Sequence, residues 1–519
     1  MRRLWSWVPL RPFWVGLALL IIFGLAAFFR VYDLGGRDIW TDEAWVALAA
    51  LKDTPQAALT AGQSTPPLYI LTVWALAQVG GSSEAVLRSL SLLFGLGTLA
   101  LFWPLARALT SMSASLLGLA MVAFSPIMVY YAKELKQYSS DAFFAVLVFF
   151  LVERLRRRDS KGAWPALAVA GTLGLGFSHT LVFILPVALA GLWFILPPTR
   201  RLRVALLGGV WAAAVAAGYF LFLRRQMDPE LVAYWAQDFP DFSGLGAFLG
   251  WFGEAVYRYF WYFFGEWGIY WGLPLLGAGI VALRKQGASR AGLYLGGPLL
   301  LALGAAALHR YPFMAHYGGN RLMLFSAPLL YLVAAVGLMS ILTWLWQKRQ
   351  RVLALALTGL ILLALNPSEL IQENLYPSYN REEIQPLVDH LQSQLRPRDL
   401  IYVYYFAIPP FKYYYRGSGK RICWGKSCEE RDLAVPAAGT GPPRRLWLIA
   451  SHITSLADMR EFAAELLGTE WREVSCLTRI SAVLFCFEWQ GPQLAKSRTT
   501  LAAPGESDPP VLPPDRAYK

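Results

Sequence analysis

Long uncharged runs follow one another from Pro12 to Ser368. About 20 apolar residues in a helix cross the roughly 30 Å hydrocarbon core of a bilayer, so runs near this length predict membrane spans. No small-residue cleavage site follows the first run and more runs come later, which favours a retained span over a signal peptide. The eleven predicted spans are Pro12–Phe29, Ser89–Ala106, Ala108–Ala132, Gln137–Val152, Gly162–Ser178, Thr180–Thr199, Val204–Leu223, Trp267–Leu283, Ala291–Leu308, Leu322–Gln347 and Val352–Ser368.

Lys and Arg concentrate in every second connection between these runs. Basic loops stay on the cytoplasmic side of a membrane, so this alternation places the N-terminus inside. The inner segments, whose only acids are Glu153 and Asp159, are then Met1–Arg11, Arg107, Glu153–Lys161, Arg200–Arg203, Arg284–Arg290 and Lys348–Arg351. The predicted outer segments are Arg30–Arg88, Lys133–Lys136, Arg224–Glu266, His309–Arg321 and the region from Glu369 onward.

Two further apolar segments predict helices lying in the outer membrane interface. The uncharged segment Thr54–Ser83 contains three prolines, and counting it as a span would turn every later basic loop outward. We therefore expect Pro66–Val79 to be an amphipathic interfacial helix. Trp251–Trp267 is rich in Trp and Tyr, which favour the headgroup level.

The pattern changes after Glu369 to short alternating and helical stretches. Residues 369–489 predict a small extracytoplasmic α/β domain, following a transmembrane catalytic domain over residues 1–368. Residues 490–519 are rich in proline and predict a disordered tail. The expected fold is thus a mainly α polytopic membrane protein with about eleven transmembrane helices. The predicted C-terminal elements are helices Ile384–Leu395 and Leu456–Leu467, strands Leu400–Phe406 and Arg445–Ser451, and a hairpin at Trp471–Trp489.

All cysteines fall in this C-terminal region. Confinement of Cys423, Cys428, Cys476 and Cys486 to an outward domain favours disulfides in an oxidising compartment. Buried free thiols are the alternative, and a zinc site is disfavoured because neither close pair has the C-x₂-C spacing.

Composition supports the membrane interpretation. Apolar residues make up 56% of the 519 residues, charged residues 16%, and the mean hydropathy is +0.41. Soluble domains carry about 25% charged residues, so an ordinary cytosolic enzyme and a disordered protein are both excluded. The net charge of +13 follows from the basic inner loops and does not predict a nucleic-acid partner.

The first outer segment contains two adjacent acids between tryptophans. Asp42 and Glu43 lie between Trp40 and Trp45. Adjacent carboxylates beside apolar rings resist ionisation, which suits a general base tuned toward neutral pH. Acids in the first turn of a helix would give the same pattern, so both interpretations remain open.

The second outer segment contains a Glu–Lys–Tyr pattern. On a continuing helix, Glu134 would share a face with Tyr138, and Lys136 would lie on another flank. A solvated helix end with a local ion pair is the alternative. Cationic residues near other outer ends, namely His179, His309, Arg310, His316 and Arg321, could form an anion site suited to phosphate.

Common nucleotide and hydrolase motifs are missing from the sequence. Gly425-Lys426-Ser427 lacks the glycine that a phosphate loop needs at position 420, which is Lys. No dinucleotide fingerprint, H-E-x-x-H or G-x-S-x-G motif is present.

Several motifs, in order along the chain, resemble the bacterial family 39 branch of the glycosyltransferase-C superfamily, which includes protein O-mannosyltransferases and the lipid A aminoarabinose transferase. The acidic pair together with E-x-R-x-Y is the most specific part, and Lys136 stands where the family often has Arg. These motifs are Arg30-Val31-Tyr32-Asp33-Leu34, Trp40-Thr41-Asp42-Glu43-Ala44, Thr65-Pro66-Pro67-Leu68-Tyr69, Glu84 and Arg88 with Ser91 and Gly95, Ser125-Pro126 with Tyr130-Tyr131, Glu134-Leu135-Lys136-Gln137-Tyr138, and Tyr311-Pro312-Phe313 with Asn320-Arg321-Leu322.

The resemblance implies a multi-pass enzyme of the cytoplasmic (inner) membrane that acts at the outer face. Its donor would be a sugar on a polyprenyl phosphate, and its acceptor a protein, lipid or glycan. The acceptor would displace the lipid phosphate in one inverting step. A polysaccharide polymerase or ligase, and a non-enzymatic transporter or assembly scaffold, are the alternatives.

Site roles follow from the resemblance by position. Asp42 would be the general base, and Glu43 would orient it. Glu134 would position the acceptor or a metal, while Lys136 would bind the donor phosphate less firmly than Arg, because Lys is a point charge. Tyr131 and Tyr138 would line the same pocket, and Arg321 would be a second phosphate contact. The cofactor stays unknown; a divalent metal ion is the candidate, with Glu134 and His179 as its only suggested pair.

Overall fold

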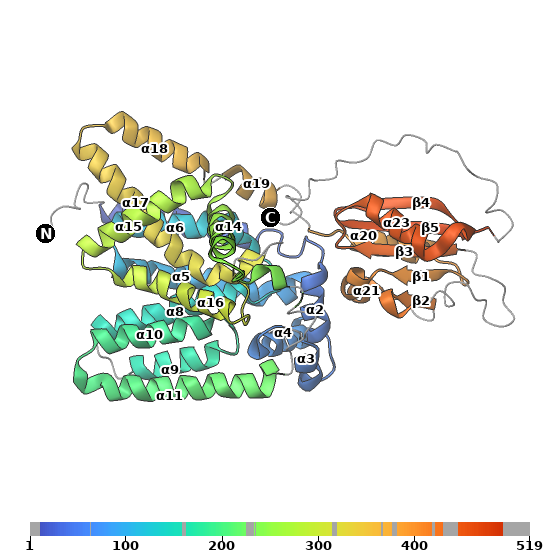
Figure 1. Cartoon of the computed structure of the whole chain (residues 1–519), viewed down its shortest axis with the longest axis horizontal. Helices are drawn as coiled ribbons and strands as arrows, with labels where there is room; N and C mark the ends of the chain where they lie inside the picture. The colour runs from blue at the N-terminus through green and yellow to red at the C-terminus, as the bar shows by residue number, and fades with distance from the viewer. Residues whose placement is uncertain are drawn as a thin grey trace. The chain divides into compact units, whose positions relative to one another are not determined.

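The computed structural model describes most of the chain and divides it into two compact units (Figure 1). The helical unit comprises Met1–Leu34 and Ala58–Ser378, and the sheet unit comprises Gly35–Ala57 and Tyr379–Lys519. We describe each unit by itself. The described residues are 11–62, 64–157, 162–224, 233, 235–313, 319–364, 367–375, 381–417, 421–428 and 445–490, so the predicted tail lies outside them.

Each of the eleven segments predicted to span overlaps at least one helix. The two predicted interfacial segments are helical as well, as α4 and α14. The helices of the helical unit are α1 (Pro12–Val31), α3 (Pro55–Ala61, which begins in the sheet unit), α4 (Pro67–Gly80), α5 (Glu84–Leu109), α6 (Met112–Phe124), α7 (Pro126–Ala132), α8 (Tyr138–Arg157), α9 (Ala163–Gly174), α10 (Leu181–Ile195), η1 (Pro198–Arg200), α11 (Arg201–Gly218), η2 (Tyr219–Leu223), η3 (Ala236–Asp238), α14 (Leu245–Phe264), α15 (Gly268–Lys285), α16 (Arg290–Ala307), η4 (Gly319–Ser326), α17 (Ala327–Gln347), α18 (Arg351–Ala364) and α19 (Pro367–Leu375).

Fewer helices qualify as membrane spans when each must be both long enough and apolar enough to cross a bilayer. Within the described residues, five helices are long and apolar enough to cross a membrane, and two bent pairs raise the number to seven. The pairs are α6 with α7, bent by 56°, and α14 with α15, bent by 91°. The predicted count of eleven is therefore not confirmed, because several of the other helices are too short or too charged.

Small residues allow α15 and α17 to pack closely. A Cβ added at Gly337 would meet the backbone oxygen of Leu275, and one added at Gly279 would meet that of Val333. Glycine at such crossings lets two helix backbones approach, which is how helices associate where the hydrophobic effect is weak.

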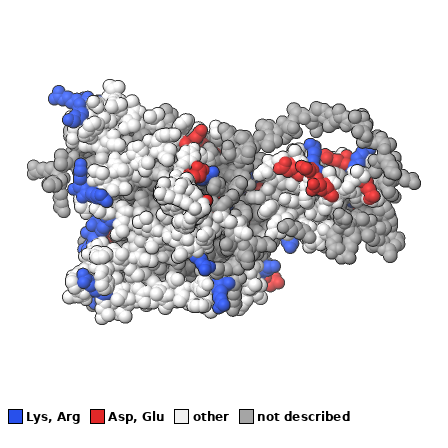
Figure 2. All heavy atoms as spheres, viewed as in Figure 1, with Lys and Arg blue, Asp and Glu red and all other residues white. Residues whose placement is uncertain are grey.

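The basic helix ends of the helical unit meet around one buried acid. Glu153 accepts from Arg156 Nε (2.8 Å), Arg290 Nε (2.9 Å) and Tyr294 Oη (3.0 Å). Arg157 donates to the carbonyl oxygen of Ala108, in the last turn of α5 (2.6 Å). Figure 2 shows Lys and Arg gathered along one edge of this unit, as the predicted inner loops require.

The sheet unit contains a five-stranded mixed sheet in the order β2-β1-β3-β5-β4. Strand β1 pairs in parallel with β2 and β3, whereas β5 pairs antiparallel with β3 and β4. Helix α23 packs its Met459, Ala463 and Leu467 on one sheet face. The elements are α2 (Thr41–Ala50), α20 (Gln385–Gln394), β1 (Leu400–Val403), η5 (Tyr405–Ala407), α21 (Ile408–Tyr414), β2 (Arg421–Trp424), η6 (Gly425–Ser427), β3 (Arg445–Ser451), α23 (Leu456–Leu467), η7 (Gly468–Glu470), β4 (Trp471–Arg479) and β5 (Ala482–Trp489).

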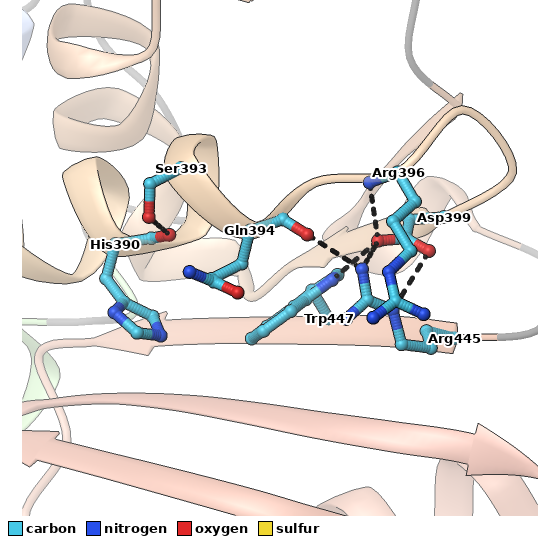
Figure 3. A network of polar contacts seen from close by, with 7 residues as sticks. All are labelled: His390, Ser393, Gln394, Arg396, Asp399, Arg445 and Trp447. Atoms are coloured by element: carbon cyan, nitrogen blue, oxygen red, sulfur yellow. Dashed lines mark hydrogen bonds and ion pairs between the residues drawn. The ribbon is translucent and has the colours of Figure 1, made fainter.

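The end of α20 is fixed to β3 by a buried acid (Figure 3). Asp399 accepts from Arg445 Nη2 (2.7 Å), Trp447 Nε1 (3.0 Å) and the Arg396 backbone N–H (3.0 Å). Arg445 also donates to the carbonyl oxygen of Gln394, the last residue of α20 (2.7 Å). A charged pair this buried is stable only when its remaining hydrogen-bonding groups are satisfied, as they are here.

The expectation of disulfides is confirmed for one pair. Cys423 and Cys428 form a disulfide, whereas Cys476 and Cys486 keep their thiols. Cys476 pairs with Phe485 across β4 and β5, so Cys486, the next residue, points to the opposite face. Burial raises the pKa of Cys486 to about 11.

Candidate functional site

The segment between α7 and α8 is a turn, which agrees with the predicted link Lys133–Lys136, so the helix on which Glu134 and Tyr138 would share a face does not form. Helix α7 ends at Ala132 and α8 begins at Tyr138. The backbone N–H of Lys136 donates to the carbonyl oxygen of Glu134 (2.8 Å), which closes a tight turn that a helix cannot contain.

The charged residues of this turn are buried, which excludes the solvated helix end. Lys133 and Glu134 are each 1% exposed and Lys136 is 9% exposed. Lys133 Nζ donates to the carbonyl oxygen of Tyr32, just after α1 (3.3 Å). Burying a charge is costly unless it is paired or binds a ligand, and ionisable residues buried in a membrane-spanning unit often mark a functional site, so this turn is a candidate site of the helical unit.

Aromatic rings and an arginine form one wall beside the turn, which we call the tyrosine wall (Tyr131, Tyr138 and Arg321). The rings of Tyr131 and Tyr138 are 5.1 Å apart, edge to face. The Arg321 guanidinium, from η4, lies over the Tyr138 ring at 5.7 Å. Tyr262 Oη donates to Tyr131 Oη (2.9 Å). The structure therefore brings Tyr131, Tyr138 and Arg321 together.

A hydrogen-bonded chain holds the backbone at Lys136. Ser91 Oγ donates to the carbonyl oxygen of Lys136 (3.1 Å), so Tyr69 Oη donates to Ser91 Oγ (2.6 Å). All three residues are buried. Tyr69 and Ser91 belong to the sequence motifs named above, but only the structure shows that they fix the lysine.

His179 lies in the turn between α9 and α10, beside the start of α8. Ser140 donates to the carbonyl oxygen of Phe177 in this turn (2.6 Å), and Ser178 donates to Asp141 Oδ1 (2.5 Å). Burial lowers the pKa of His179 to about 4, so the ring is neutral at pH 7. Asp141 is a buried acid that sequence reasoning treated only as an interruption of a span.

Of the other predicted cations, His309 and Arg310 have different surroundings, and His316 lies outside the described residues. His309 packs its ring on Phe239 (4.8 Å), and Arg310 is exposed. Residues 314–318 lie outside the described residues. Within the part of the chain that is described, no group of three or more His, Cys, Asp or Glu side chains is arranged to hold a metal ion, so we derive no step through a metal.

The acid pair belongs to the sheet unit, whereas the other six predicted site residues belong to the helical unit. Asp42 and Glu43 occupy the first turn of α2, where acids interact favourably with the helix dipole. This position is compatible with a catalytic role as well. Helix α2 begins at Thr41, whose backbone N–H donates to Glu382 Oε2 (3.3 Å). The C-terminal residues that hold this helix were not foreseen, because the bonds join positions 341 residues apart.

Comparisons with known proteins give a family match over part of the chain and solved structures with a similar fold. Residues 64–223 match the sequence model of the family described as dolichyl-phosphate-mannose-protein mannosyltransferase. The crystal structure of ArnT from Cupriavidus metallidurans in the apo state is similar with a TM-score of 0.53 at 14% identity, covering 93% of this chain and 99% of that chain. The ArnT structure bound to undecaprenyl phosphate has a TM-score of 0.55 at 14% identity, covering 94% and 100%. No curated protein sequence matches significantly.

These findings confirm the resemblance to the glycosyltransferase-C superfamily. The chain has a multi-pass membrane fold with a small C-terminal sheet, and the expected enzyme class, a glycosyltransferase, is the class of the matched family. The matched segment contains the turn at Glu134, His179 and most of the tyrosine wall, but not the acid pair or Arg321.

Proposed function

We propose that this protein transfers a sugar from a polyprenyl phosphate to an acceptor at the outer face of the cytoplasmic membrane. The observation that carries the proposal is the buried cationic turn with its tyrosine wall in a fold shared with ArnT. The ArnT structure with undecaprenyl phosphate suggests the same type of donor here. A lipid donor also agrees with the missing nucleotide motifs.

The cations would act on the leaving group. As the bond between the anomeric carbon and the phosphate oxygen breaks, negative charge grows on the lipid phosphate. Lys136 and Arg321 would neutralise it, and a fixed charge in a buried site is effective because it needs little reorganisation during the reaction. Arg321 can bind two phosphate oxygens, which compensates for the single ammonium of Lys136.

The acid pair would act on the nucleophile. Asp42 would take the proton of the acceptor hydroxyl while the oxygen attacks the anomeric carbon. One bond forms as one breaks, so configuration inverts and the products are the glycosylated acceptor and the polyprenyl phosphate. Glu43 would orient Asp42, Glu134 would position the acceptor, and Tyr131, Tyr138 and His179 would line the pocket.

The orientation proposed from the loop charges puts this chemistry outside. The helix ends around Glu153 hold the basic residues and would face the cytoplasm. The turn at Lys136 lies at the other end of α8 and would face outward. Cysteines placed at either end and labelled by an impermeant reagent test this orientation.

Loss of the gene should remove one sugar from the cell envelope. Mass spectrometry of envelope glycolipids, glycans and proteins from a deletion strain, compared with the complemented strain, names both the sugar and its acceptor. An envelope in which no glycosylated species changes would contradict the proposal. Loss of long repeating chains would favour the polymerase or ligase alternative.

A single substitution tests the base. Asp42→Asn should abolish transfer while the protein is still made and folded, because the amide cannot accept the proton. The matched control is Asp53→Asn, an exposed acid shortly after the same helix. Full transfer by Asp42→Asn would remove Asp42 from its role. If that variant works but deletion of residues 369–519 does not, the scaffold alternative is favoured.

A further inference from the structure

Two helices of the sheet unit cap each other's N-termini. The N-cap residues of α2 and α20 are Trp40 and Ile384, and neither makes a side-chain cap hydrogen bond. Instead, Glu382 Oε2 accepts from the backbone N–H of Thr41, the first residue of α2 (3.3 Å). Asp38 Oδ2 accepts from the backbone N–H of Gln385, the first residue of α20 (2.9 Å). Each carboxylate stands three residues before one helix and caps the other.

This exchange matters because the first N–H groups of a helix have no partner within it. A carboxylate there satisfies a donor and also interacts favourably with the helix dipole. Helix α2 has only ten residues, so its first turn is a large part of it. The start of α2 therefore depends on Glu382, a residue of the C-terminal region.

Glu382 is itself held in place. Its Oε1 is 2.7 Å from His452 Nδ1, and its side chain is almost fully buried. His452 follows β3 with φ +60°, a conformation that non-glycine residues adopt only when their surroundings fix them. The next residues along the chain, Glu383 after Glu382 and Ile453 after His452, bind the β4–β5 turn. Their backbone N–H groups donate to the carbonyl oxygens of Ile480 (2.9 Å) and Ser481 (3.3 Å), respectively.

The start of α2 makes further contacts with residues of the C-terminal region. The Trp40 ring is stacked with His452 at 6.3 Å, and the Arg381 guanidinium lies over it at 4.7 Å. Thr41 Oγ1 is 3.0 Å from Glu382 Oε2 and 2.9 Å from the carbonyl oxygen of Phe406, and it donates to one of them. The backbone N–H of Ile39 donates to Tyr414 Oη (2.7 Å).

We infer that Glu382, supported by His452 and the reciprocal cap of Asp38, is a positioning residue for the acid pair. Asp42 and Glu43 directly follow Thr41, so the point at which α2 starts fixes where their carboxylates point. The C-terminal region thus takes part in the reaction through the geometry of α2. This inference rests on the proposed function, since it gives α2 the general base.

The kinetic test compares substitutions that differ by one hydrogen bond. Each Glu382 oxygen serves a different partner, so Glu382→Gln puts an amide NH₂ against either Thr41 or His452. We expect kcat for transfer to fall about tenfold with KM for the donor unchanged. Thr41→Val should lower kcat, and Thr41→Ser, which keeps the hydroxyl, should restore it. Glu461→Gln, at an exposed position of α23, is the control.

Hydrogen exchange in the full-length protein tests the cap without the reaction. Glu382→Gln should speed amide exchange in residues 41–45, and Asp38→Ala should speed it in residues 385–388. Exchange in α23 should stay unchanged in both variants. Unaltered exchange at the start of α2 would overturn the capping role.

The two proposals fail in different ways. Normal kcat in Glu382→Gln, together with inactive Asp42→Asn, would overturn the positioning role and leave the proposed function intact. Full activity of Asp42→Asn would overturn the proposed base and with it the kinetic role of Glu382. A fall in kcat for Glu382→Gln that Glu461→Gln reproduces would also overturn the inference, because the effect would then be unspecific.

Discussion

The two units satisfy their polar groups over very different distances along the chain. In the helical unit, many hydroxyls bond to a backbone carbonyl four residues earlier, as Thr98 does to Phe94 and Ser340 to Val336. In the sheet unit, the carboxylates of Glu382, Asp38 and Asp399 bind partners 341, 347 and 46 residues away. A helix in lipid must satisfy itself locally, whereas a sheet domain can exchange bonds between distant segments.

Long-range bonds do occur in the helical unit, and they gather where helices break. At the break between α6 and α7, Ser125 caps α7 and bonds to Tyr331 (2.9 Å). At the turn between α7 and α8, Lys133, the Lys136 carbonyl and Tyr131 all bind distant partners. Some of the long-range polar contacts of the helical unit thus lie at the candidate site, while others, such as those of Glu153, lie at the opposite end of α8. The following variants test the contrast between the units.

The largest effect should come from the buried lysine at the turn. Lys136→Ala should lower kcat for transfer by about 100-fold or more, because a charge placed against the leaving phosphate is lost. Lys136→Arg should keep most of the activity. Lys285→Ala, at an exposed end of α15, should have no effect. A steady-state transfer assay in proteoliposomes measures this, and equal rates for Lys136→Ala and Lys285→Ala would contradict the assignment.

The next largest effect should be on stability, from removing the charge of one buried acid in each unit. Glu153→Gln leaves two arginines facing an uncharged group, and Asp399→Asn does the same to Arg445. Each should lower the free energy of unfolding by about 3–5 kcal/mol. Glu254→Gln breaks an exposed pair with Arg258 and should change little. Thermal unfolding of the full-length protein in detergent gives the comparison, and a similar shift in all three variants would refute it.

A smaller effect should follow from filling the crossing of α15 and α17. Gly337→Ala adds a methyl group where the Leu275 carbonyl lies, so it should cost about 1–3 kcal/mol of stability. Gly277→Ala on α15 has nothing within 4 Å of the added Cβ and should be neutral or slightly stabilising. Equal unfolding temperatures for both variants would show that the helices are not packed this closely.

The smallest effect concerns the thiols of the sheet unit. Because burial raises the pKa of Cys486 to about 11, its thiol is protonated near pH 8, and thiolates are the reactive form. We expect iodoacetamide to leave Cys486 unmodified in the native protein and to modify it after unfolding. Peptide mapping without reductant should recover Cys423 joined to Cys428. Rapid native alkylation of Cys486 would argue against its burial.

Much of the secondary structure followed from hydrophobic periodicity alone. Strand β3 and helix α23 begin and end where predicted, at Arg445–Ser451 and Leu456–Leu467. The hairpin at Trp471–Trp489 is also found, and the two segments predicted as interfacial helices are helical. Periodicity succeeds here because each element buries one face, and that requirement is written into neighbouring residues.

The burial and tight geometry of the turn at Glu134 and the partners of α2 could not be predicted in the same way. Lys133 to Gln137 have good helix propensity, and only the burial of Tyr131, Tyr138 and Lys136 against distant residues outweighs it. Likewise, nothing near Thr41 in the sequence indicates that Glu382 caps it.

The amino-acid sequence by itself determined the elements, the basic loops and the residue types suited to sugar transfer, because these depend on neighbours along the chain. The tertiary structure alone decided that the lysine turn is buried, that one cysteine pair is joined, and that Asp38 and Glu382 exchange caps. Those outcomes depend on which distant groups meet, and a carboxylate binds whichever N–H the fold brings within about 3 Å.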